Sequence, residues 1–220
     1  IISARYDLDH DDSGRYSETD PSYTLPIVSL DSGLIFDRDF AMSGRNITQT
    51  LEPRLFYSYT PYRNQSNIPL FDSSEADLNF AQLFNENSWT GYDRIAETNQ
   101  VTASVASRFI DAQSGLEWAK VSVGQRYYFN DQTINSAGER ISMENQKSDF
   151  LASIGARLTR TISASAFGQW SWERSSFKKA IAGVRWQPKP MSVIGLYYRY
   201  NWQENRDSDD YIDQIDLSLQ

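Results

Sequence analysis

The chain of 220 residues lacks cysteine entirely, has a single histidine, and contains no long uninterrupted hydrophobic run. The absence of cysteine excludes a catalytic thiol and a thiolate metal site in these residues. No stretch approaches the roughly 20 apolar residues that a membrane-spanning helix needs. A glycine-rich phosphate loop is also absent. The formal net charge of -8 argues against a nucleic-acid partner, because such a partner requires a basic patch.

Aromatic residues are plentiful, with 13 Tyr, 11 Phe and 6 Trp, and many fall near the ends of segments that alternate between apolar and polar residues. The clearest alternation covers 47–59. Its odd positions are mainly apolar and end in Tyr57 and Tyr59, and its even positions are polar except for Phe56. Successive side chains of a strand point to opposite faces, so this pattern predicts a strand with one apolar and one polar face. Tyrosines at the end of such a face are typical of a membrane–water interface.

The same two-residue period predicts about ten strands along the chain. They cover approximately 2–8, 23–27 (with a possible continuation at 34–36), 47–59, 101–109, 119–129, 150–158, 162–172, 180–186, 194–202 and 211–219. We interpret 37–46 as a polar turn and 130–147 as a long polar loop. A short helix is expected within 76–85, where Leu78, Ala81 and Leu83 have helical spacing.

The connections between these strands alternate in length. Long connections at 9–22, 61–96 and 130–147 contrast with tight turns at 111–115, 159–161 and 187–190. The connection at 36–45 is intermediate, and the short one at 174–177 breaks the rule. Long loops on one side and tight turns on the other are typical of outer-membrane barrels. The fold class predicted is therefore all-β, an antiparallel transmembrane β-barrel of outer-membrane type.

Several motifs, in order, resemble one known family. The runs LEPRLFYSYTPYRNQS, FDSS, GYDRIAETNQVT and VSVGQRYYF are similar to the barrel of the LptD family of outer-membrane lipopolysaccharide-transport proteins. The resemblance is strong over about 48–129 and weaker in the flanks. Several long motifs in the right order make a more specific signal than one short consensus. Since the alternation continues to both ends of the sequence, residues 1–220 are expected to be one segment of a larger barrel.

The resemblance implies a role that is translocative rather than enzymatic. It implies part of the translocon that inserts lipopolysaccharide into the outer leaflet of the bacterial outer membrane, with no cofactor. The partners it implies are lipopolysaccharide, outer-membrane lipids, a lipoprotein plug of the LptE type in the barrel lumen, and a periplasmic transport bridge reached through other parts of the parent protein. The alternative is a self-contained barrel of about ten strands that acts as a surface protease or adhesin.

Arginines recur on the polar faces of the predicted strands, and one glutamate accompanies them. We expect these side chains to face the lumen. Two interpretations stay open: a path for phosphate-bearing lipid, since arginine binds phosphate in a bidentate manner, and a wet lumen lined by mutually paired charges. The second interpretation is preferred. The residues are Glu52, Arg54, Arg108, Arg126, Arg157, Arg185 and Arg199.

The predicted loop at about 61–96 is too long for a simple hairpin and too apolar to extend into water. We expect it to pack on its own barrel and occlude the lumen, with contact to a partner as the second possibility. The resemblance supports this expectation, because large loops of this region fold inward in that family. The candidate residues are Tyr62, Arg63, Ile68, Phe71, Leu78, Phe80, Leu83, Phe84 and Trp89.

The acidic loop at 9–20 offers two further hypotheses. Asp9, Asp11, Ser13, Gly14 and Asp20 match five positions of a calcium-binding loop, although the last ligand is Asp where the motif has Glu and strands replace the flanking helices. His10 beside these carboxylates could orient a water molecule, as an Asp–His pair does in a barrel protease. A solvated acidic loop with a passive histidine is the preferred interpretation, so neither a catalytic nor a metal site is predicted.

Overall fold

The computed structural model describes residues 1–5, 21–42, 44–143, 145–205 and 208–219. The described chain is all-β with antiparallel pairing, which confirms that part of the predicted fold class. The calcium and histidine hypotheses at 9–20 fall outside the described residues. None of the helical structure in the described part reaches the length and apolarity that crossing a membrane requires.

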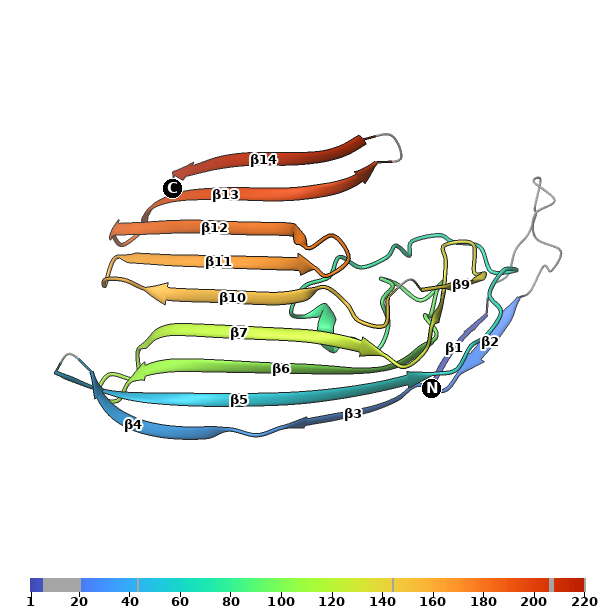
Figure 1. The fold of residues 1–220 in the computed structure, drawn as a ribbon, viewed down its shortest axis with the longest axis horizontal. Coiled ribbons are helices and arrows are strands. Elements are labelled where there is room, and N and C mark those ends of the chain that lie inside the picture. The colour runs from blue at the N-terminus through green and yellow to red at the C-terminus, as the bar shows by residue number, and fades with distance from the viewer. Residues whose placement is uncertain (6–20, 43, 144, 206–207, 220) are drawn as a thin grey trace. The chain divides into compact units, whose positions relative to one another are not determined.

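In the described part of the chain, the strands follow one another with a single helical turn, η1 (Gln82–Phe84), between them (Figure 1). They are β1 (Ile2–Arg5), β2 (Ser22–Leu25), β3 (Val28–Gly33), β4 (Phe36–Met42), β5 (Arg45–Thr60), β6 (Thr98–Asp111), β7 (Glu117–Tyr128), β8 (Gln132–Ile134), β9 (Arg140–Ser142), β10 (Phe150–Arg157), β11 (Ile162–Ser171), β12 (Ser176–Lys189), β13 (Ser192–Asn205) and β14 (Ser208–Leu219).

Hydrogen bonding joins ten strands into one sheet in the order β14-β13-β12-β11-β10-β7-β6-β5-β3, with β4 also paired with β5. Two further sheets have two strands each, β1 with β2 and β8 with β9. The chain divides into two compact units. Unit 1 comprises 1–32, 55–102 and 126–148, and unit 2 comprises 33–54, 103–125 and 149–220. Strands β3, β5, β6 and β7 therefore contribute residues to both units.

The register of unit 2 sorts its side chains into two faces. Directly paired residues lie on the same face of a sheet, so each row of partners across β7 and β10–β14 belongs to one face. The apolar face contains the row Val121, Ile154, Ala166, Ala182, Tyr198 and Ile215. The polar face contains the adjacent row Ser122, Ser153, Phe167, Ile181, Arg199 and Gln214.

The apolar side chains do not converge on a dry centre, as those of a β-sandwich would. Ile154 is 48% exposed and Leu196 53% exposed, and Val105 and Val121 are exposed as well. In unit 1, Leu55 is likewise exposed. The strand pattern therefore produces a sheet that presents its aliphatic side chains outward instead of burying them.

Two local predictions are wrong, and a third, the short helix, is confirmed only in part. Residues 36–42 form β4 and not a polar turn, because the charges of this segment have cross-strand partners: Arg38 donates to Gln49, and Thr48 donates to Asp39. The polar loop at 130–147 contains the β8–β9 hairpin. The helix expected within 76–85 is present only as the turn η1, which ends at Asn85 because the backbone is extended there. The short turns near 111–115, 159–161 and 174–177 are confirmed, and the turn expected at 187–190 lies at Pro190 and Met191.

Tyr197 fills a gap over two glycines on the polar face of unit 2. Gly183 pairs directly with Tyr197, and Gly195 lies two residues before it on β13. A Cβ added at Gly183 would lie 2.2 Å from the Tyr197 ring, and one at Gly195 would lie 2.8 Å from it. The ring therefore occupies space that only glycine leaves open. Gly155, on the same face, differs because an added Cβ would meet nothing within 4 Å.

We predict that Gly183→Ala destabilises the sheet by about 1–3 kcal/mol, since overpacking must displace the Tyr197 ring. Gly155→Ala is the matched control and should have little effect. Adding Tyr197→Ala should remove most of the penalty at Gly183, because the clashing ring is gone. Denaturant unfolding of the three variants measures their free energies of unfolding. An equal loss of stability at both glycines would contradict the close contact between the Tyr197 ring and Gly183.

Candidate functional site

In unit 1, one face of β5 and β6 is buried although most of its residues are polar. The buried residues alternate with half-buried or exposed ones such as Leu55, Tyr57 and Tyr59. We call this the covered face; it consists of Phe56, Ser58, Thr60, Thr98, Gln100 and Thr102. A buried polar surface needs hydrogen-bond partners. Within the covered face, Ser58 and Thr98 lie 3.5 Å apart, and the loop at 61–97 provides an acceptor for Thr102.

The turn η1 is fixed on the covered face through its backbone carbonyl groups. The guanidinium of Arg126, on β7, donates to the carbonyl oxygens of Gln82 at 2.5 Å, Leu83 at 2.9 Å and Asn85 at 3.3 Å. The Thr102 hydroxyl donates to the Leu83 carbonyl at 2.7 Å. Carbonyl groups at the end of a helical turn lack internal partners, so a guanidinium with several donors satisfies them at once. Arg126 is 4% exposed and Leu83 is fully buried.

Phe56 provides the apolar part of the same contact. This residue interrupts the polar positions of the predicted strand, and the structure gives the reason. Its ring packs edge-to-face against Phe84 of η1, with centroids 6.2 Å apart and planes at 70°. Such aromatic pairs contribute about 0.5–1.5 kcal/mol beyond the area they bury. Phe56, the apolar exception in the strand, therefore marks the place where the loop packs on the sheet.

Side-chain amides hold the loop together internally. The Gln65 amide group donates to the Ile95 carbonyl at 2.8 Å and accepts from the Ile95 amide at 3.0 Å, which imitates a strand pairing. The Asn87 amide group does the same between the Arg94 carbonyl and the Ala96 amide. Ile68 and Ile95 pack with residues of β2 in the hydrophobic core of unit 1, and the Tyr23 hydroxyl donates to the Tyr92 carbonyl.

Two charged residues are buried within this arrangement. Arg94, 1% exposed, donates to the carbonyl groups of Ile68 at 2.7 Å and Ser136 at 3.1 Å, so it links the loop to the β8–β9 segment. The Asp93 carboxylate accepts from the backbone amides of Phe71 and Asp72. Hydrogen bonding to Asp93, together with the repulsion between the two carboxylates, raises the pKa of Asp72.

The β8–β9 hairpin is bound to the loop through Glu97 and Arg140. Arg140 forms a two-point ion pair with Glu97 at 2.6 and 2.8 Å, and its guanidinium lies 4.9 Å from the centre of the Tyr62 ring. Gly138, at φ +80°, lets the hairpin approach the loop closely, because an added Cβ would lie 2.4 Å from the Gln65 carbonyl oxygen. Only glycine suits both the positive φ and this contact.

A small polar pocket of ≈ 180 Å³ lies in unit 1 beside these contacts. Its lining is formed mainly by polar side chains of the strands and the hairpin. The residues include Glu75, Glu97, Gln100, Arg126, Tyr128 and Gln132. Within the described residues, no cluster of His, Asp or Glu is arranged to hold a metal ion.

The predicted loop residues occupy three environments. Ile68 and Leu83 are buried, whereas Leu78, Phe80, Phe84 and Trp89 are half-buried. Tyr62, Arg63 and Phe71 are exposed, although Tyr62 stacks on Arg140. The structure thus gathers the apolar members around η1 and the core of unit 1, and it leaves these three at the loop surface.

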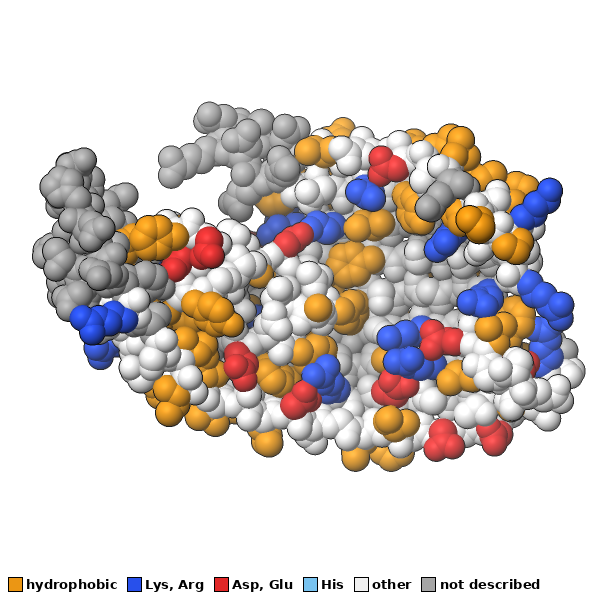
Figure 2. Space-filling view, turned by 180° about the vertical axis from the view of Figure 1, so that it is seen from behind, with side chains coloured by type: hydrophobic (Ala, Val, Ile, Leu, Met, Phe, Trp, Pro, Cys, Tyr) orange, Lys and Arg blue, Asp and Glu red, His pale blue; other side chains and the backbone are white. Residues whose placement is uncertain are grey.

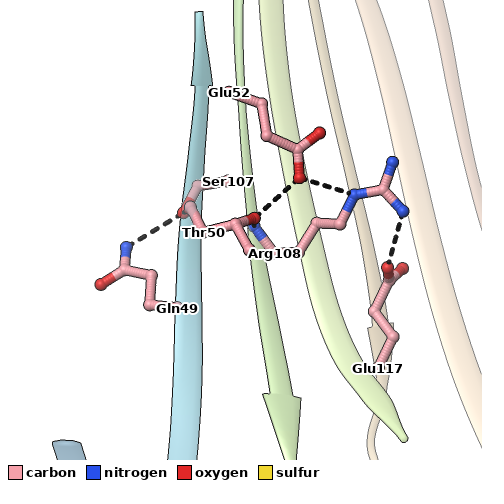
Figure 3. Close-up of polar contacts among 6 residues, drawn as sticks. All are labelled: Gln49, Thr50, Glu52, Ser107, Arg108 and Glu117. Carbon is pink, nitrogen blue, oxygen red and sulfur yellow. Dashed lines mark hydrogen bonds and ion pairs between the residues drawn. The ribbon is translucent and has the colours of Figure 1, made fainter. Parts of the chain in front are cut away.

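Of the predicted lumen-facing set, Arg108 forms a network with two carboxylates (Figure 3). In unit 2 its Nε lies 3.0 Å from Glu52 Oε1, and its Nη1 lies 3.2 Å from Glu117 Oε2. Thr50 donates to Glu52 at 2.8 Å, and Gln49 donates to Ser107 at 3.0 Å. All three charges are partly exposed, so this network contributes modestly to stability.

The remaining members of that set differ in environment. Arg54 is half-buried on β5, and Arg126 belongs to the covered loop contact described above. Arg157 and Arg185 are exposed and lie in one row of the polar face, since both pair with Ser163. Arg199 lies on the same face, with its Nε 3.3 Å from Asp216.

Sequence reasoning missed the buried polar residues that organise the loop, namely Gln65, Asp93 and Arg94, and the close backbone approach at Gly138. Their partners are mostly backbone groups, which leave no pattern in a sequence. Phe56 did leave a signal, because an apolar residue on a polar strand face requires something to cover it.

Comparison with known proteins gives a consistent result. The family model described as LPS transport system D, LptD, matches residues 3–220. A protein named LPS-assembly protein LptD from Aromatoleum aromaticum is 42% identical over 220 residues, which is 100% of this chain and 27% of that protein. Proteins of the same name from Bordetella avium and Azoarcus sp. are each 43% identical, over 81% and 89% of this chain and 22% and 24% of their own length. The chain thus spans about a quarter of the length of these curated relatives.

We predict that Arg126→Met releases the loop, because the carbonyl groups of η1 lose their donor and each unsatisfied buried group costs about 1–3 kcal/mol. Limited proteolysis of the folded protein should then cut within 77–90, where the wild type resists. Arg63→Met removes an exposed arginine of the same loop and should leave the cleavage pattern unchanged. Cleavage of Arg126→Met at the wild-type rate would show that Arg126 does not hold η1.

Proposed function

Because the chain belongs to the LptD family, we propose that it forms part of the wall of an outer-membrane barrel that delivers lipopolysaccharide to the outer leaflet. The observation that carries this proposal is the two-faced sheet of unit 2. Its apolar face exposes aliphatic and aromatic side chains across successive strands. In a bilayer these side chains would contact lipid, and the polar face would line a hydrated interior.

The loop at 61–97 is the second element of the proposal. We assign it the role of an occluding element that keeps the interior of the barrel closed. Support comes from its attachment: Arg126, Thr102 and Phe56 hold η1 on the covered face, and Gln65 and Arg94 fix the loop internally. A loop held by this many buried contacts would be a rigid obstruction and not a mobile surface segment.

We also propose the partners of the whole transport system that the family resemblance implies. They are lipopolysaccharide as the transported substrate, outer-membrane lipids around the wall, a lipoprotein plug of the LptE type, and a periplasmic bridge reached through other parts of the parent protein. No catalytic role is proposed, since the relatives are named for assembly. The alternative of a self-contained protease or adhesin barrel is not favoured, because a relative named for LPS assembly matches the whole chain.

Two adjacent residues on opposite faces test the wall. Ile154→Arg should destabilise the folded parent protein in lipid by roughly 2–4 kcal/mol if the side chain lies near the bilayer midplane. Ser153→Arg, on the polar face, should cost much less because its charge stays in water. Refolding titrations into lipid vesicles measure both. Equal tolerance of arginine at positions 153 and 154 would contradict the proposed contact between the apolar face and lipid.

The occluding role is tested by shortening the loop where the structure allows it. Ala76 and Ser88 are joined by a backbone hydrogen bond of 2.8 Å, so 77–86 can be replaced by a short Gly-Ser linker without separating the rest of the loop. Single-channel conductance of the purified parent protein with its plug should rise. An equal linker inserted at Met191, in an exposed turn, serves as control. Unchanged conductance after the excision would show that the loop does not close the pore.

A further inference from the structure

The polar face of unit 2 carries a group of cations that the pairing register brings together. Lys120 pairs with Gly155, and Arg157 lies two residues beyond Gly155 on the same strand. Arg157 pairs with Ser163, which in turn pairs with Arg185. Neighbouring strands are about 4.8 Å apart, so the backbones of Arg157 and Arg185 are separated by about 10 Å. We call Lys120, Arg157 and Arg185 the cationic cluster.

Acidic side chains do not neutralise this cluster. The described strands β10–β12 contain no carboxylate, and Lys179 lies farther along β12. On β7 the nearest carboxylate, Glu117, is paired with Arg108. The carboxylates of unit 2 that could compete are already engaged: Glu52 and Glu117 by Arg108, and Asp216 by Arg199. Among the described residues, no ion pair joins a carboxylate to any of the three cations of the cluster. The cluster therefore concentrates positive charge in a chain whose net charge is -8.

The floor between these cations is open and made of small residues. Gly155 lies between Lys120 and Ser165 in one row, and a Cβ added there would meet nothing within 4 Å. Ser163 and Ser165 place hydroxyl groups on the same face. Figure 2 shows several Lys and Arg side chains toward its right-hand end, where the short turns of the unit 2 strands lie. The register thus places Ser163 directly between Arg157 and Arg185, and Lys120 on the neighbouring strand beside Gly155.

We propose that the cationic cluster binds phosphate groups of the transported glycolipid, an inference that rests on the proposed function. Arginine presents paired donors that match phosphate oxygens, and lysine adds a point charge. Two arginines about 10 Å apart suit a headgroup with more than one phosphate. An acidic protein surface fits less well, because a protein interface needs an apolar centre and the rows around Gly155 contain mainly Gly, Ser and cations.

Binding to the full-length parent protein with its plug tests this assignment. The probes are lipopolysaccharide, the same material after enzymatic dephosphorylation, and inorganic pyrophosphate as competitor. The wild type should bind the phosphorylated form roughly tenfold more tightly, since hydrogen bonds to charged groups contribute more than neutral ones. Pyrophosphate and high salt should both reduce this preference. The variant Lys120→Gln/Arg157→Gln/Arg185→Gln should lose the preference and still bind the dephosphorylated form as the wild type does.

Controls separate this inference from the proposed function. Lys178→Gln, near the opposite end of β12, should keep the wild-type preference. If the wild type binds no lipopolysaccharide, the proposed function fails; if it binds with a preference that the triple variant retains, only the cluster assignment fails. Pyrophosphate binding without discrimination between the two lipopolysaccharide forms would identify a free-anion site and overturn the glycolipid assignment. Loss of the plug from the triple variant with the phosphate preference intact would indicate a protein-docking surface instead.

Discussion

The strict two-residue alternation of an antiparallel sheet is the constraint on which this structure depends. Each pairing fixes the face of both partners, so a row such as Val121, Ile154 and Ala166 extends across the strands without a change of face. A register shift of one residue would place Arg157 and Arg185 among the exposed aliphatic side chains. The sheet can therefore separate an apolar from a polar environment only while its register holds, and the tight turns at 158–161 and 190–191 maintain that register.

The loop at 61–97 shows how the same sheet supports an irregular segment. Irregular backbone leaves donors and acceptors unpaired, and burying them is unfavourable unless side chains replace the missing partners. Arg126 does this for η1, Gln65 and Asn87 do it for the segment before β6, and Arg94 does it for Ile68 and Ser136. Each of these side chains forms hydrogen bonds with backbone atoms of irregular segments. The loop therefore keeps its conformation without regular secondary structure.

The structure could be predicted from the sequence where apolar and polar side chains alternate. It could not be predicted where hydrogen bonds to backbone groups determine the conformation. Strands β5–β7 and β10–β14, their faces and the short turns could all be predicted, because a two-residue period assigns each side chain to one face of the sheet. Strand β4 was missed because Asp37, Arg38 and Asp39 resemble a turn, although Arg38 and Asp39 have partners on β5. The position of the loop could be inferred from its apolar content, but its attachment through Arg126 and its close approach at Gly138 could not. Both depend on carbonyl groups, which are the same for every residue type.

Arginine has two distinct roles in this chain, and burial and partners distinguish them. Arg94 and Arg126 are buried and donate to carbonyl oxygens, and Arg108 bridges two carboxylates, so these three guanidinium groups are satisfied within the protein. Arg157 and Arg185 instead lie exposed over small residues, with the nearby carboxylates already paired elsewhere. If polar lining were the only requirement, serine or asparagine would meet it without the mutual repulsion of unpaired cations. Leaving Arg157 and Arg185 without carboxylate partners does not stabilise the sheet. An external anion that binds between them explains these two arginines better than a structural role does.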